Sequence, residues 1–104
     1  MALTLASAAR LLSEHGLLRE IIQGDAWTLD AQTVNGFDKP FSSITYDTRQ
    51  VVSGTLLCCK GRFKAEYLDG IDDRGLAAYV AENDFSAATK TPGLIVNDAR
   101  KAMS

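Results

Sequence analysis

The stretch that decides the fold covers residues 44–61 and reads I-T-Y-D-T-R-Q-V-V-S-G-T-L-L-C-C-K-G. Around its start, residues 42–47 alternate Ile44 and Tyr46 with small polar residues, a pattern typical of a half-buried strand. Further on, residues 55–59 form a continuous run of the kind found in strands buried inside a sheet. Polar and glycine residues separate the two runs, so the stretch predicts two strands joined by a turn.

The rest of the chain alternates helical and extended patterns. Apolar residues at helical spacing follow Thr4, a good N-cap, and predict a helix that reaches about Glu14 and stops at Gly16. A second helix is predicted over residues 65–74, with Gly75 as its stop. Further short strands are predicted at residues 17–22, 77–81 and 94–96. This order indicates the α/β fold class, with a small open sheet, parallel or mixed, flanked by helices.

Packing outside the strands also follows from the apolar pattern. Several side chains are expected in the core: Trp27, Leu29 and Val34, as plugs that fasten the loosely patterned residues 23–40, and Tyr67, Leu68 and Ile71 of the second helix. Asp98 is a good N-cap for a last helix. Because only about one turn of that helix fits before Ser104, we expect the chain to continue in a longer protein.

Composition narrows the class of protein. With 104 residues, 46% of them hydrophobic and 23% charged, the chain is predicted to form one globular domain. A net charge of −2 argues against nucleic acid as a partner. No apolar run approaches the roughly 20 residues of a membrane span, and the N-terminus does not have the basic start of a signal peptide. The adjacent Cys58 and Cys59 point to opposite faces of a strand, so two reduced thiols in a cytoplasmic protein are expected.

The motif residues of the opening stretch resemble a known family. The order D-[ST]-R, G-x-L and K-G is similar to the head of the amino-acid-adding Mur ligases of peptidoglycan synthesis. Here it reads Asp47-Thr48-Arg49, Gly54-Thr55-Leu56 and Lys60-Gly61. Further segments resemble the MurE-type ligases, the UDP-N-acetylmuramoyl-tripeptide synthetases, and above all their lysine-adding branch: residues 19–22, 63–68, 78–82 and 95–98. The resemblance covers essentially the whole chain.

The resemblance implies a division of labour along a longer chain. Residues 1–104 would be the N-terminal domain that holds the UDP end of a UDP-N-acetylmuramoyl-dipeptide, followed by ATP-binding and amino-acid-binding domains. The parent would be an ATP- and Mg²⁺-dependent, amide-forming ligase that adds L-lysine to UDP-N-acetylmuramoyl-L-alanyl-D-glutamate in cell wall synthesis, on which cell shape and division depend. The sequence contains no G-x-x-x-x-G-K-[ST] phosphate loop and no cluster with metal-ligand spacing. We therefore expect residues 1–104 alone to be inactive, with no catalytic residue, no metal site and no bound cofactor.

The resemblance also places the substrate contacts. They are expected at Tyr46, Thr48, Arg62, Phe63 and Lys64. The chemistry agrees, because the Thr48 hydroxyl can donate to a phosphate or carbonyl oxygen. Arg62 and Lys64 can supply charge to a diphosphate, and Phe63 offers a ring face for stacking on uracil. Ligands of open α/β sheets bind beyond the strand ends, where these residues fall.

Other interpretations of the same residues stay open. Asp47 and Arg49 can simply brace the turn, the first as an Asx cap and the second through an ion pair. Phe63 would then be a core residue and Lys64 a solvated charge. Tyr46 would contact the ligand through its backbone while its ring packs inside. At the level of function, the alternatives are the N-terminal domain of the D-Ala-D-Ala-adding Mur ligase and a free-standing nucleotide-sugar-binding or interaction module.

Overall fold

The computed structural model describes residues 3–23, 26–30, 38–59, 64–68, 70–83, 85 and 89–98. Its helices are α1 (Leu5–Glu14) and three short 3-10 helices, η2 (Thr48–Gln50), η3 (Ala65–Leu68) and η4 (Asp72–Arg74). Its strands are β1 (Leu18–Gln23), β2 (Ala26–Thr28), β3 (Ser43–Thr45), β4 (Thr55–Cys58), β5 (Ala78–Ala81) and β6 (Gly93–Val96). No helix among these residues is long and apolar enough to cross a membrane.

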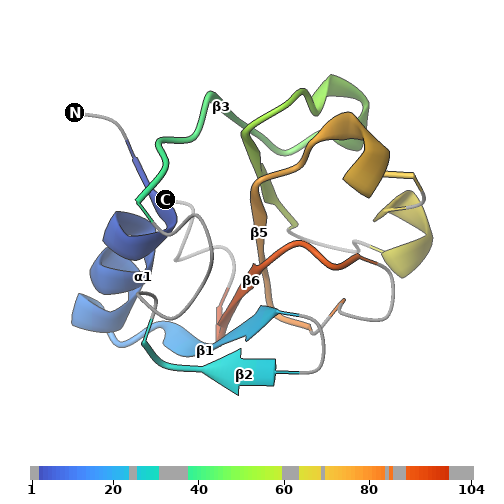
Figure 1. The fold of residues 1–104 in the computed structure, drawn as a ribbon. Helices are drawn as coiled ribbons and strands as arrows, with labels where there is room; N and C mark the ends of the chain where they lie inside the picture. Colours follow the sequence, from blue (N-terminus) through green and yellow to red (C-terminus); the bar gives the residue numbers. More distant parts are fainter. Residues whose placement is uncertain are drawn as a thin grey trace.

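The strands form one mixed sheet in the order β2-β1-β6-β5-β4-β3 (Figure 1). The four strands from β3 to β6 are parallel, whereas β1 pairs antiparallel with both β6 and β2. The predicted α/β class with a mixed open sheet is therefore confirmed. Because β3 and β4 are parallel neighbours, the segments that follow them leave the same edge of the sheet.

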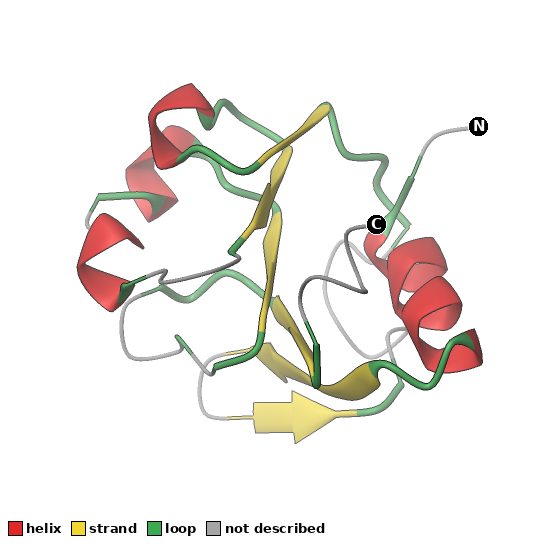
Figure 2. Ribbon diagram, turned by 180° about the vertical axis from the view of Figure 1, so that it is seen from behind, coloured by secondary structure: helices red, strands yellow, loops and turns green. Residues whose placement is uncertain are grey.

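Each face of the sheet carries its own apolar core. Figure 2 shows α1 on one side of the sheet and the 3-10 helices on the other. Strand β4 contributes to both, with Leu56 in the cluster under α1 and Leu57 in the opposite cluster, which also contains Cys59 just after the strand. All residues of β4, β5 and β6 are buried, as their apolar runs predict.

The predicted first helix is confirmed together with its ends. Thr4 and Ser7 form a reciprocal capping box, in which the Ser7 amide donates to the Thr4 hydroxyl at 3.1 Å and the Thr4 amide to the Ser7 hydroxyl at 2.8 Å. Gly16 follows the helix with a φ of +69°, a left-handed conformation that glycine adopts without steric cost.

The alternation around β3 is real, but its buried member is not the predicted one. The side chains of Ile44 and Tyr46 are 53% and 54% exposed, while Thr45 is only 9% exposed. Strand β3 lies at the edge of the sheet, and the cluster under α1 contains no buried β3 residue. The face that carries Ile44 is thus left uncovered, and the small polar residue turns inward.

Two other packing predictions need correction. Trp27 and Leu29 are 67% and 65% exposed, so they do not plug the core; they belong to the edge strand β2 and the residues after it. Val34 lies outside the described residues. In place of a continuous helix over residues 65–74 there are η3 and η4, with Gly70 between them at a φ of +73°, a conformation that ends a helix.

The side chains of that segment divide as well. Leu68 and Ile71 are buried as predicted, but Tyr67 is 49% exposed because the broken segment no longer presents one helical face. Gly75 ends η4 at a φ of +83°, which confirms the predicted stop. The last helix, predicted after Asp98, lies outside the described residues.

The two cysteines are free and buried, in agreement with the sequence prediction. Burial, with a smaller contribution from the neighbouring Cys58, raises the pKa of the Cys59 thiol to about 12. A thiol with such a pKa stays protonated at neutral pH and is therefore a poor nucleophile.

Candidate functional site

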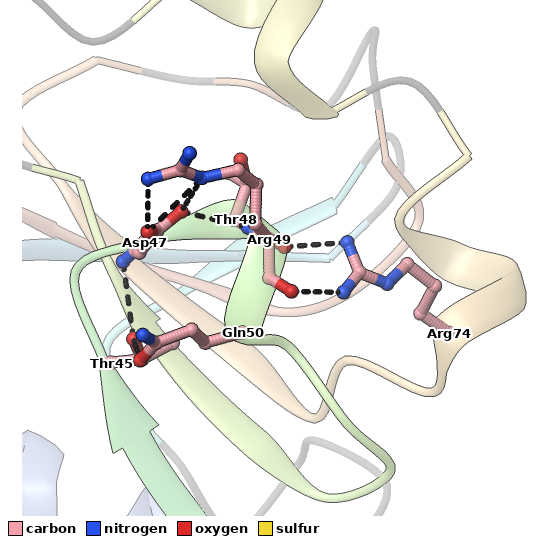
Figure 3. A network of polar contacts seen from close by, with 6 residues as sticks. All are labelled: Thr45, Asp47, Thr48, Arg49, Gln50 and Arg74. Atoms are coloured by element: carbon pink, nitrogen blue, oxygen red, sulfur yellow. Dashed lines mark hydrogen bonds and ion pairs between the residues drawn. The ribbon is translucent and has the colours of Figure 1, made fainter.

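The site begins with the polar turn that follows β3. Asp47 is the N-cap of η2, and its carboxylate accepts a hydrogen bond from the Arg49 amide at 2.9 Å (Figure 3). The Arg49 guanidinium donates to the same carboxylate, from Nε to Oδ1 at 3.1 Å and from Nη2 to Oδ2 at 2.8 Å. The interpretation of Asp47 as an Asx cap and Arg49 as its ion-pair partner is thus confirmed.

The electrostatics of the pair follow from this geometry. The hydrogen bonds from the Arg49 side chain and then its backbone amide lower the pKa of Asp47, and the carboxylate raises the pKa of Arg49. Both groups therefore stay charged at neutral pH. The Arg49 side chain is 87% exposed, so water and salt screen the pair and its role is local bracing.

A second set of contacts, centred on the buried Thr45 of β3, supports the turn from the interior side. The buried Thr45 hydroxyl accepts a hydrogen bond from the Asp47 amide at 3.1 Å and donates to Gln50 Oε1 at 3.3 Å. The Gln50 backbone amide donates to the Asp47 backbone carbonyl at 3.0 Å. These bonds explain why a polar residue takes the inward position of β3: its hydroxyl satisfies polar groups of the turn that burial would otherwise leave unpaired.

Arg74, which the sequence patterns did not indicate as a site residue, binds backbone carbonyls of the turn. Arg74 of η4 donates from Nη1 to the Thr48 carbonyl at 2.5 Å and from Nη2 to the Arg49 carbonyl at 2.8 Å (Figure 3). Its Nη2 also donates to the Val51 carbonyl at 3.0 Å. The local signal at this position, a basic residue just before Gly75, predicts a cap of its own helix. It does not predict a contact to a turn that lies 26 residues earlier in the chain.

Of the predicted contact residues, Thr48 lies on this braced turn and is half-buried. Its carbonyl is held by Arg74, and the described residues offer no hydrogen-bond partner to its hydroxyl. Tyr46 directly precedes the turn, and its ring is exposed at the end of β3 rather than packed inside. The structure thus presents a hydroxyl and an aromatic ring at the edge where β3 ends.

The loop that follows β4 is only partly described. Lys64 is exposed, and its Nζ lies 4.0 Å from Glu66 Oε1, so its charged partner among the described residues belongs to its own segment, as expected for a solvated charge. Because β3 and β4 are parallel neighbours, Lys64 and Thr48 follow strands that end at the same edge. Arg62 and Phe63 lie outside the described residues, so their roles remain predictions.

A hollow of about 440 Å³ lies at the opposite edge, where the parallel strands begin. Its lining residues include Phe41 before β3, Gly54 before β4, Ala77 before β5 and Pro92 before β6. The hollow is therefore distinct from the braced turn, which follows the carboxyl end of β3. Its lining, as far as the structure describes it, includes none of Tyr46, Thr48 and Lys64.

Comparisons with known proteins find relatives that match all or most of this chain. It is 75% identical over 104 residues to a UDP-N-acetylmuramyl-tripeptide synthetase of Bifidobacterium longum, covering 100% of this chain and 20% of that protein. It is 43% identical over 95 residues to a UDP-N-acetylmuramoyl-L-alanyl-D-glutamate--L-lysine ligase of Streptococcus pneumoniae, covering 90% of this chain and 18% of that one. The chain thus spans about a fifth of the length of these curated relatives.

The fold has a solved counterpart. MurF from Acinetobacter baumannii matches 96% of this chain and 19% of its own with a TM-score of 0.62, at 16% sequence identity. At that identity the likeness concerns the fold alone, which is that of a Mur ligase N-terminal domain. A search of protein-family profiles finds no match.

Proposed function

Because this chain belongs to the Mur ligases, we propose that residues 1–104 are the domain of a longer ligase that holds the UDP end of its nucleotide-sugar substrate. The parent adds L-lysine to UDP-N-acetylmuramoyl-L-alanyl-D-glutamate in the synthesis of peptidoglycan. The names of the relatives support this reaction over the D-Ala-D-Ala-adding enzyme and over a free-standing module. The free, buried thiols agree with the cytoplasm as the place of the parent.

The observation that carries the proposal is the Thr48 hydroxyl on a turn where several neighbouring polar groups are already engaged. The Asp47 carboxylate, the Thr45 hydroxyl and the backbone carbonyls of Thr48, Arg49 and Val51 have partners. A hydroxyl that is fixed in space but has no described partner can donate to a phosphate or uracil oxygen without first breaking another bond. In this proposal Tyr46 contacts the same ligand, and Arg62, Phe63 and Lys64 approach it from the loop after β4.

The parent's reaction requires ATP and Mg²⁺ in the family, and we place both outside this chain. The described residues contain no group of three or more His, Cys, Asp or Glu side chains that would ligate a metal ion. The sequence contains no phosphate loop. Residues 1–104 therefore contribute to the reaction by binding and orienting the nucleotide end, and ATP turnover is not expected from them alone.

A titration of the chain with UDP, followed by NMR and calorimetry, tests the proposal. We expect weak binding with shift changes centred on Thr48 and Tyr46. Thr48→Val keeps the shape but removes the donor, which should cost about 0.5–1.5 kcal/mol, or roughly a two- to tenfold rise in Kd. Thr28→Val, on the far edge strand β2, is the matched control and should leave Kd unchanged.

Two results would contradict the proposal that Thr48 contacts the nucleotide. Shift changes confined to α1 or to the hollow at the amino ends of the strands, with Thr48 silent, would show that the nucleotide binds elsewhere. A Thr48→Val variant with unchanged Kd would remove the hydroxyl from the site.

A further inference from the structure

The three carbonyls that Arg74 binds belong to Thr48 and Arg49, the first two residues of the short helix η2, and to Val51, its C-cap. In so short a helix the Thr48 carbonyl accepts a backbone hydrogen bond from the Val51 amide at 3.3 Å, while the carbonyls that follow must find partners elsewhere or face water. The Arg74 guanidinium supplies donors to the carbonyls of Thr48, Arg49 and Val51 at 2.5, 2.8 and 3.0 Å. A planar fork can serve several carbonyls at once, which a lysine ammonium on its flexible stem does poorly.

The segment that carries Arg74 is itself anchored. On the same short helix, the Asp72 carboxylate accepts hydrogen bonds from the hydroxyl of Thr89, the Lys90 amide at 3.1 Å and the Thr91 hydroxyl at 3.0 Å. Ile71, just before η4, is 1% exposed. Arg74 thus extends from an anchored segment, so its hydrogen bonds connect the turn to η4 and to the core that Ile71 packs into.

This tie differs in kind from the other contacts of the turn. The bonds of Asp47 with Arg49 lie within the turn, and the bonds of Thr45 join the turn only to the end of β3, the strand that it directly follows. Arg74 comes from 26 residues further along the chain and joins the β3–β4 connection to the segment before β5. Its loss would leave the turn joined to β3 but would remove the hydrogen bonds that hold it to the segment before β5.

We propose that Arg74 is the positioning residue of the nucleotide site: it holds residues 48–51 in place so that the Thr48 hydroxyl meets the ligand. Both of its terminal nitrogens are engaged with backbone carbonyls, so it acts through the turn rather than by touching the nucleotide. The inference rests on the proposed function, because the ligand that Thr48 meets is the UDP end of that substrate.

The test compares UDP binding by the 104-residue chain with that of Arg74→Gln, Arg74→Lys, Thr48→Val and the Arg74→Gln/Thr48→Val double variant. Arg74→Gln should raise Kd about two- to tenfold, the scale on which one ligand hydrogen bond is lost, and Arg74→Lys should fall between it and the unchanged chain. The double variant should bind no worse than Thr48→Val alone, because a displaced hydroxyl and an absent one are equivalent. Arg10→Gln, on the exposed side of α1, is the charge-matched control and should leave Kd unchanged.

Two further readouts separate positioning from other roles. A residue that merely stabilises the fold would lower Tm while leaving Kd unchanged well below Tm, and that result would overturn the inference. A residue that touches the diphosphate would reduce the salt dependence of binding when removed, whereas positioning leaves that dependence unchanged. Additive losses in the double variant would equally overturn the inference.

The two hypotheses fail in different ways. If the unchanged chain does not bind UDP, the proposed function fails and the role of Arg74 in it fails too. If the unchanged chain binds UDP and Arg74→Gln binds it equally well, only the positioning role is wrong. Should Arg74→Gln not fold, Arg74→Lys supports the inference by binding more weakly than the unchanged chain at the same salt dependence, and overturns it by binding equally.

Discussion

Replacing Gly93 by alanine should disrupt the contact between β5 and β6, because Gly93 lies under the ring of Tyr79. The two residues are partners in the parallel register, and Tyr79 is fully buried. A Cβ built on Gly93 would lie 2.2 Å from Tyr79 Cζ and 2.5 Å from both Cε2 and Oη. Carbon atoms in contact are normally about 3.5–4.0 Å apart, so the ring or the strand must move.

The cost follows from what such a movement breaks. Overpacking of a well-packed core costs about 1–3 kcal/mol. The Tyr79 hydroxyl also accepts a hydrogen bond from the Phe85 amide at 3.2 Å, and a displaced ring would forfeit roughly 0.5–1.5 kcal/mol more. We therefore expect Gly93→Ala to lower the free energy of unfolding by about 2–4 kcal/mol, with Tm falling by roughly 4–8 °C per kcal/mol in a domain of this size.

Urea denaturation followed by circular dichroism measures this loss. Gly16→Ala is the comparison, because it meets no atom within 4 Å and carries only the backbone strain of a φ of +69°. Tyr79→Leu removes the clashing ring atoms, so the Gly93→Ala/Tyr79→Leu double variant should be at least about 1 kcal/mol more stable than the sum of the single losses. A Gly93→Ala variant within about 0.5 kcal/mol of the unchanged chain, or additive losses, would refute the steric argument.

Two further predictions concern ionisable groups. Burial raises the pKa of Asp72, but the hydrogen bonds from Thr89, the Lys90 amide and Thr91 outweigh it and lower the pKa below its usual 3.8. The charged carboxylate therefore adds stability that is present above pH 3.8 and is lost as pH falls through the folded-state pKa. Urea midpoints measured between pH 2 and 7 should drop more steeply below pH 4 in the unchanged chain than in Asp72→Asn. Parallel curves for the two proteins would contradict this. Because burial raises the pKa of Cys59 to about 12, iodoacetamide should leave this thiol unmodified in the native chain. In denaturant without reductant, mass spectrometry should show both Cys58 and Cys59 alkylated. Protection of the two thiols in denaturant would indicate a disulfide.

Much of the secondary structure could be predicted because its signals are local. The helix that Thr4 caps and the stop at Gly16 depend on neighbours within a few residues, and both are present as expected. The buried strands β4, β5 and β6 carry apolar runs that no exposed position would accommodate. The bracing of Asp47 by Arg49 is equally local and was one of the two interpretations open from the sequence.

Only the tertiary structure decided which side of β3 is buried and what holds the turn after it. Alternation shows that the two faces of a strand differ, but the packing of α1 determines which face is buried. The core cluster under α1 holds no buried β3 residue, so Ile44 is exposed and Thr45 is the buried residue of the strand. Arg74 reaches the Thr48 carbonyl from 26 residues away, a contact that no local pattern encodes. Sequence patterns report neighbours along the chain, whereas the position of the Thr48 hydroxyl depends on segments that only the folded sheet brings together.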